Sequence, residues 1–204
     1  MKKKFASILI LAAALGLSGC SAAVTEQEPK AAAAAAAAPA ANDAPARNER
    51  GNLQKAMGEE GAVTFPGSDR DAITFRVTSI VRNPECTGDP MWYTPSEIGE
   101  FVALTFEITT AEDYLNLMAA KEPLPVYWQD WVTYNAAGEV VENTASGFGC
   151  FPDEEQLKND GFPAGTTTTG VYVVDAPLDA ISVAWAPTYI QGVSEDDRWE
   201  WLIP

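Results

Sequence analysis

The chain contains no histidine, and this absence removes several kinds of chemistry at once. Histidine is the commonest metal ligand and the commonest general base near neutral pH. Without it, neither a Ser-His-Asp triad nor a Cys-His pair can be assembled. Paired carboxylates remain as a route to acid and base catalysis, but no spacing in the sequence singles out a pair. We therefore expect a protein that is not an enzyme.

Basic residues are also scarce, since the 204 residues include 13 lysines and arginines against 29 aspartates and glutamates. Over residues 61–204 the balance is 6 basic against 23 acidic residues, a net charge of −17. Nucleic acids bind proteins largely through lysine and arginine contacts to phosphate, so no nucleic-acid partner is expected. We expect the acidic excess to serve solubility rather than the binding of a specific cationic partner.

The N-terminus has the features of an export signal. Lys2, Lys3 and Lys4 precede an apolar stretch over residues 5–17, which is shorter than a membrane span. The stretch ends in Leu-Ser-Gly-Cys at residues 17–20, which resembles the bacterial lipobox. That resemblance implies a lipoprotein signal peptide over residues 1–19 and a diacylglyceryl group on Cys20. An ordinary cleaved signal peptide and an uncleaved anchor are the alternatives.

The expected location follows from this motif. Two acyl chains hold a protein stably at a bilayer, so we expect a lipid-anchored protein on the extracytoplasmic face of the cell membrane. Residues 20–60 contain three prolines, an unbroken alanine run over residues 31–38 and few large apolar side chains. They lack the material for a core and are expected to form a disordered tether. The globular domain is then predicted to span residues 61–204.

Cysteine occurs only three times, at positions 20, 86 and 150. If Cys20 carries lipid, Cys86 and Cys150 are the remaining thiols in an oxidising compartment, and a disulfide is their simplest state. Their surroundings, "RNPECTGDP" and "SGFGCFPDE", are dense in turn-forming residues and predict a bond between two loops. A reactive redox pair is the competing interpretation, but the C-x-x-C spacing is absent.

The domain has the period-two hydrophobicity of strands. "DAITFRVTSIVR" places Ile73, Phe75, Val77 and Val81 on one face, and "GEFVALTFEITT" alternates in the same way. "LPVYWQDWVTYN" and "GEVVENT" predict a hairpin, and three further β-rich runs follow. The expected fold class is all-β: an antiparallel, immunoglobulin-like sandwich of about seven strands. Residues 110–123 and 152–160 are expected to supply one or two short helical insertions.

The order of these strands resembles a bacterial domain-of-unknown-function family. Its members are exported lipoproteins with an immunoglobulin-like β-sandwich ectodomain, related to a small secreted immunogenic protein of mycobacteria. The resemblance rests chiefly on Pro163-Ala164-Gly165, the "VYVV" strand and the turn Asp175-Ala176-Pro177. It implies a fold and carries no catalytic residues.

Aromatic residues are the candidates for binding. The segment "VYWQDWVTY" alternates, so one face must be core and the other exposes either Tyr127, Gln129 and Trp131 or Trp128 with Asp130. The structural alternative is that loop insertions and the second sheet cover both faces. Trp92 and Tyr93, in a loop close to Cys86, either pack against the disulfide or contact a ligand.

No cofactor and no metal is expected, since the acidic runs at residues 153–155 and 195–197 lack the spacing of a calcium loop. The expected function is a lipid-anchored module that binds a protein, peptide or glycan of the cell envelope. The alternative is a non-catalytic accessory or structural subunit of an envelope transporter or machine, without a ligand of its own.

Overall fold

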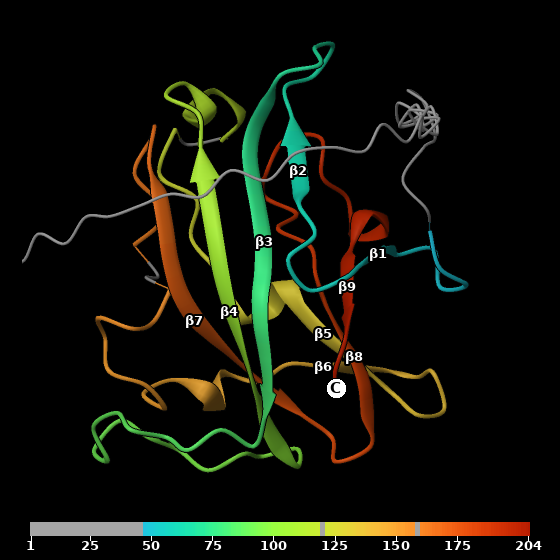
Figure 1. The fold of residues 1–204 in the computed structure, drawn as a ribbon, viewed down its shortest axis with the longest axis vertical. Coiled ribbons are helices and arrows are strands. Elements are labelled where there is room, and N and C mark those ends of the chain that lie inside the picture. The colour runs from blue at the N-terminus through green and yellow to red at the C-terminus, as the bar shows by residue number, and fades with distance from the viewer. Residues whose placement is uncertain (1–46, 119–120, 158–159) are drawn as a thin grey trace, which may run out of the picture. The chain divides into compact units, whose positions relative to one another are not determined.

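The computed structural model describes residues 47–118, 121–157 and 160–204, and Cys20 lies outside them. These residues form two packed β-sheets, as the alternating pattern predicts, with nine strands rather than about seven (Figure 1). One sheet has the order β1-β9-β8-β5-β6 and the other β2-β3-β4-β7. The strands are β1 Leu53–Lys55, β2 Gly61–Thr64, β3 Asp71–Arg82, β4 Glu100–Thr110, β5 Trp131–Asn135, β6 Val140–Glu142, β7 Thr167–Ala176, β8 Ala180–Trp185 and β9 Trp199–Leu202.

The prediction of a disordered tether to residue 60 is wrong in its last part. Strand β1 pairs with β9 in parallel, with Leu53 opposite Trp199 and Lys55 opposite Trp201. Leu53 is buried in the main core, and Asn52 is buried beside it. The domain therefore begins before residue 61. Among the described strands this is the one parallel pair in an otherwise antiparallel sandwich.

The core between the sheets is aromatic. Phe75 of β3 packs edge-on against Trp199, with ring centroids 4.8 Å apart, and Phe106 of β4 packs edge-on against Trp131 at 5.4 Å. Such pairs add about 0.5–1.5 kcal/mol beyond the burial of their area. Trp131, Trp185 and Trp201 are each only 1% exposed. The two sheets are thus held together by large rings that interlock.

A β-bulge changes which side chains face the core at the end of β3. The pairing of β3 with β4 shifts register between Val77 and Ser79. Because one extra residue turns the following side chains to the opposite face, Ile80 is buried and Val81 is 47% exposed. The expected inward position of Val81 is therefore wrong. In β4, which has no such shift against β7, the expected inward residues are all buried.

The expected helical insertion at residues 110–123 is a single turn of 3₁₀ helix, η1 (Tyr114–Leu117), whereas the one expected at residues 152–160 has turns and no helix in its described part. Three further 3₁₀ turns are η2 (Trp128–Asp130), η3 (Ala145–Gly147) and η4 (Glu195–Asp197), and none of the described residues forms an α-helix. No helix in the described part of the chain is long and apolar enough to cross a membrane.

Candidate functional site

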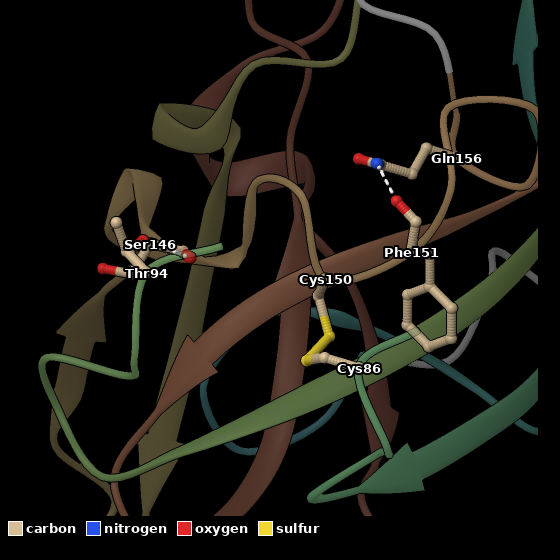
Figure 2. The surroundings of a disulfide bond; sticks show 6 residues. All are labelled: Cys86, Thr94, Ser146, Cys150, Phe151 and Gln156. Atoms are coloured by element: carbon tan, nitrogen blue, oxygen red, sulfur yellow. Dashed lines mark hydrogen bonds between the residues drawn. A yellow bond between two sulfur atoms is a disulfide. The ribbon is translucent and has the colours of Figure 1, made fainter. Parts of the chain in front are cut away.

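A disulfide between Cys86 and Cys150 joins the loop after β3 to the loop after β6, as predicted (Figure 2). The Cα atoms of the two cysteines are 4.4 Å apart. The backbone N–H groups of Thr87 and Gly88 both donate to the carbonyl oxygen of Cys150, at 2.8 and 3.0 Å. We call residues 83–99 and 143–157 the disulfide loops. Covalent and backbone bonds together fix them to each other.

Two glycines permit this close approach. A Cβ atom at Gly88 would lie 2.1 Å from the carbonyl oxygen of Gly149, which no real structure tolerates. Gly149 itself has a φ of +79°, the left-handed region that favours glycine, and a Cβ there would lie 2.7 Å from the carbonyl oxygen of Trp92. The glycine-rich context of both cysteines is therefore a requirement of the contact between the loops.

The disulfide loops cover the outer face of the four-stranded sheet. Phe101, Ala103 and Val173 point away from the main core and form a second small cluster with Cys150. The ring of Tyr93 lies edge-on to Phe101, with the centroids 6.0 Å apart. This packing explains why Ala103 is buried although the alternation of β4 places it on the side away from the other sheet.

A buried carboxylate holds both loops to β7. Asp175 is fully buried and accepts hydrogen bonds from the Glu97 N–H at 2.8 Å and from the Thr144 hydroxyl at 2.9 Å. Its own N–H donates to the side-chain oxygen of Asn143 at 2.8 Å. The Ser96 hydroxyl also donates to it, so both loops supply donors and this single side chain holds them on the sheet.

The exposed aromatic side chains gather on these loops and on the neighbouring turn η2. Within the described residues, all five aromatic residues of the exposed class lie there. We call them the aromatic surface: Trp92 (71% exposed), Tyr93 (38%), Tyr127 (49%), Trp128 (37%) and Phe148 (49%). Neither alternative face of the segment 126–134 is exposed as a whole, because Trp128 and Gln129 are exposed next to Tyr127, whereas Asp130 is buried.

Trp131 does not belong to this surface, and its place among the candidate binding residues is wrong. The segment 126–134 is not one strand, because residues 128–130 form η2 and β5 begins only at Trp131. The turn breaks the alternation, and the Trp131 ring enters the core, where it stacks on Tyr172 with centroids 4.7 Å apart. The two tryptophans of this segment therefore have different roles.

Phe148 was not among the candidates from the sequence. It lies between Gly147 and Gly149, where no alternation can place it on a face. The neighbouring residues could have indicated that Phe148 is exposed, because a large ring in a turn next to a disulfide-bonded cysteine has few neighbours to bury it. Phe148 and Trp128 line one narrow crevice of about 20 Å³, with Tyr172 also in the lining. This shared crevice connects η2 to the disulfide loops.

A larger groove lies between the two disulfide loops. It has a volume of about 420 Å³, with Asp89 and Trp92 on one loop and Phe151, Asp153 and Glu154 on the other. Ligand sites commonly have volumes of about 300–1,000 Å³, so the groove is large enough for more than one side chain of a partner. It is the concave part of the candidate site.

Asp130 is a buried carboxylate close to the aromatic surface. It is 9% exposed, and its carboxylate accepts from the Tyr127 N–H at 3.2 Å. The nearby Tyr189 hydroxyl donates its proton to the carbonyl oxygen of Pro125. Burial raises the pKa of Asp130 to about 6, against the smaller opposing effect of the Tyr127 N–H. A raised pKa alone does not indicate catalysis, and the Tyr189 hydroxyl beside Asp130 is engaged with the Pro125 carbonyl oxygen.

Metal binding finds no support within the described residues, which contain no group of three or more cysteine, aspartate or glutamate side chains arranged to hold an ion. Asp197 of the second acidic run is engaged instead with Arg47, at 2.8 Å between Nη2 and Oδ1.

No protein-family model matches the chain, and no curated protein sequence matches it. Three solved structures are similar to it. They are the secreted protein MPT63 from Mycobacterium tuberculosis (12% identity, 74% of this chain and 97% of that one, TM-score 0.47), the yjhA protein from Bacillus subtilis (14%, 72% and 98%, 0.44) and an uncharacterized β-sandwich protein from Clostridium difficile 630 (12%, 79% and 100%, 0.43).

Proposed function

We propose that this chain is a lipid-anchored, extracytoplasmic β-sandwich that binds a partner in the cell envelope through its aromatic surface. The observation that carries the proposal is the position of the exposed aromatic rings. Of the five in the described residues, Trp92, Tyr93 and Phe148 lie on loops that a disulfide and a buried aspartate hold in place, and the other two lie at the neighbouring turn η2. Aromatic residues dominate the energetic centres of interfaces, and a rigid surface loses little conformational entropy on binding.

The N-terminal sequence supports the location. The Leu-Ser-Gly-Cys motif at residues 17–20 resembles a lipobox, and a disulfide between Cys86 and Cys150 fits an oxidising compartment. In the view of Figure 1 the described chain begins on the right, beside β9, whereas the disulfide loops lie at the lower left. The start of the described chain therefore lies away from the disulfide loops.

Partner capture tests the binding site. The full-length protein, solubilised from membranes in mild detergent, serves as bait for other envelope components. The double variant Trp92→Ala/Phe148→Ala should weaken capture by roughly 30-fold, which corresponds to about 2 kcal/mol. A matched control, Met57→Ala/Leu202→Ala, removes exposed apolar side chains from another surface and should leave capture unchanged. Equal capture by both variants would assign the partner to another surface, and no captured partner would favour the accessory role.

Membrane fractionation tests the anchor. Cys20→Ala should leave the protein unprocessed or release it from membranes, because the thioether that carries both acyl chains cannot form. A cleaved variant that stays in the membrane fraction at high salt would rule out Cys20 as the anchor. This result bears on the location alone and leaves the capture experiment intact.

A further inference from the structure

The groove beside the disulfide has acidic and aromatic residues on both of its walls. Asp89 and Trp92 come from one disulfide loop, and Phe151, Asp153 and Glu154 come from the other. The Trp92 ring is 71% exposed, so much of it is free for contact with a ligand. Asp89 is held in place, because its side chain accepts the Met91 N–H at 2.9 Å.

In the part of the chain that the structure describes, no basic side chain pairs with the acidic side chains of the groove. The two disulfide loops contain six acidic and no basic residues: Glu85, Asp89, Glu97, Asp153, Glu154 and Glu155. Among the described residues none of the six forms an ion pair with a lysine or arginine. Some acidic residues elsewhere are paired, such as Asp113 with Arg70, and others, such as Asp69, are not. The groove differs in that it places unpaired carboxylates beside the exposed ring of Trp92.

Carboxylates beside an open aromatic ring favour a cationic ligand. Lysine and arginine side chains pair with carboxylates, and their cationic groups are attracted to the face of an indole within about 6 Å. An anionic polymer would meet repulsion from six carboxylates. A divalent ion is also disfavoured, because the described residues offer no cluster of three ligating side chains.

We propose that this groove binds lysine or arginine side chains from a basic peptide segment of a partner protein. The proposal rests on the proposed function and adds the chemical class of the partner. A peptide fits better than a single small amine for two reasons. The volume of about 420 Å³ exceeds what one ammonium group fills, and the acidic residues lie on both walls, so that neighbouring basic side chains each find a carboxylate.

Fluorescence anisotropy with a labelled decapeptide of alternating lysine and glycine tests the proposal on the full-length protein. The variant Asp89→Asn/Asp153→Asn/Glu154→Gln keeps the size of the side chains and removes three charges from the groove. The control Glu49→Gln/Asp69→Asn/Glu112→Gln removes three charges from exposed positions elsewhere. At 50 mM salt the groove variant should bind at least tenfold more weakly than the control, and a serine-glycine decapeptide should not bind.

The variant Trp92→Ala distinguishes binding in the groove from non-specific attraction of a basic peptide to an acidic protein. It leaves the charge unchanged and should still weaken binding of the lysine peptide by about fivefold. Equal losses in the two charge variants, or no loss in Trp92→Ala, would overturn the proposal. If Trp92→Ala/Phe148→Ala abolishes partner capture while the three groove charges have no effect on it, the basic-peptide inference fails and the proposed function stands.

Discussion

Two regions of this domain use carboxylates in opposite ways. On the outer face of the five-stranded sheet, Glu200 is fully buried and meets Arg50, Asn48 and Asn52. On the disulfide loops, six acidic residues have no cationic partner among the described residues. The first region uses charge to fix the N-terminal segment to the sheet. The second leaves charge available to solvent or to a partner.

The surroundings of Glu200 explain this difference. Burial alone would raise its pKa, but hydrogen bonds from Arg50, Ser182 and the two asparagines outweigh burial and hold the pKa below its usual value. The Arg50 guanidinium also lies over the Tyr134 ring, 4.6 Å from its centroid. We call Glu200 with its polar partners Asn48, Arg50, Asn52 and Ser182 the Glu200 clamp. The overall acidity of the chain does not tell which carboxylates are structural and which are free. Their burial and their hydrogen-bond partners do.

The largest expected effect comes from breaking the Glu200 clamp. Arg50→Ala leaves the Glu200 charge buried without its cation, which should lower the free energy of unfolding by about 3–5 kcal/mol. Arg76→Ala is the control, because it removes an arginine from a largely exposed pair with Glu107 and should cost about 1 kcal/mol or less. Urea unfolding at pH 7 measures both. Similar losses in the two variants would mean that the clamp contributes no more than a surface ion pair.

The disulfide loops should be stabilised mainly by their covalent bond. Cys86 and Cys150 are 64 residues apart, so Cys86→Ala/Cys150→Ala should lower the free energy of unfolding by about 4 kcal/mol in the chain-entropy model. Unfolding of the unaltered protein in the presence of a reductant is the control and should give a similar loss. A loss under about 1 kcal/mol would show that the bonds to Asp175 and the small core under Phe101 hold the loops without the disulfide.

Asp130 tests a third kind of carboxylate, which is buried without a cation. Its pKa of about 6 lies above the unfolded value of about 3.9, so the folded state binds this proton more readily. The penalty for its charge is absent below about pH 4 and grows as the pH rises through 6. Asp130→Asn should therefore raise the free energy of unfolding by about 3 kcal/mol at pH 7 and by little at pH 4.

The control for this pH dependence is the exposed Asp69→Asn, which should have no effect at either pH. Chemical unfolding in buffers from pH 4 to 7 follows the difference between each variant and the unaltered protein. A stabilisation by Asp130→Asn that does not change with pH would refute the assignment of the effect to the buried charge.

Local patterns were enough to predict the sandwich and the disulfide. The alternation in β4 is unbroken, and the inward residues follow from it. The disulfide follows from counting cysteines in an exported chain. Strand β1 could not be predicted in this way, because its three residues form a strand only through pairing with β9, about 146 residues further along the chain.

The candidate site was predictable only in part, and for a related reason. Trp92 and Tyr93 stood out because they lie in a proline-rich loop near a cysteine. Trp128 is exposed and Trp131 is buried because of η2, and a period-two pattern cannot anticipate this turn in "VYWQDWVTY". The bulge in β3 exchanged Ile80 and Val81 in the same way. The errors thus concentrate where one residue interrupts a regular period.

The smallest expected effect is the sharpest test of whether the aromatic surface is free to bind. Trp92→Ala should change the free energy of unfolding by about 0.5 kcal/mol or less, because a ring that is 71% exposed loses little burial on truncation. Trp131→Ala is the matched comparison and should cost about 3–5 kcal/mol, since its ring is 1% exposed between Phe106 and Tyr172. Both are measured by thermal and urea unfolding. A loss above about 2 kcal/mol for Trp92→Ala would make Trp92 a packing residue of the disulfide loops. The proposed binding surface would then lose its most exposed ring.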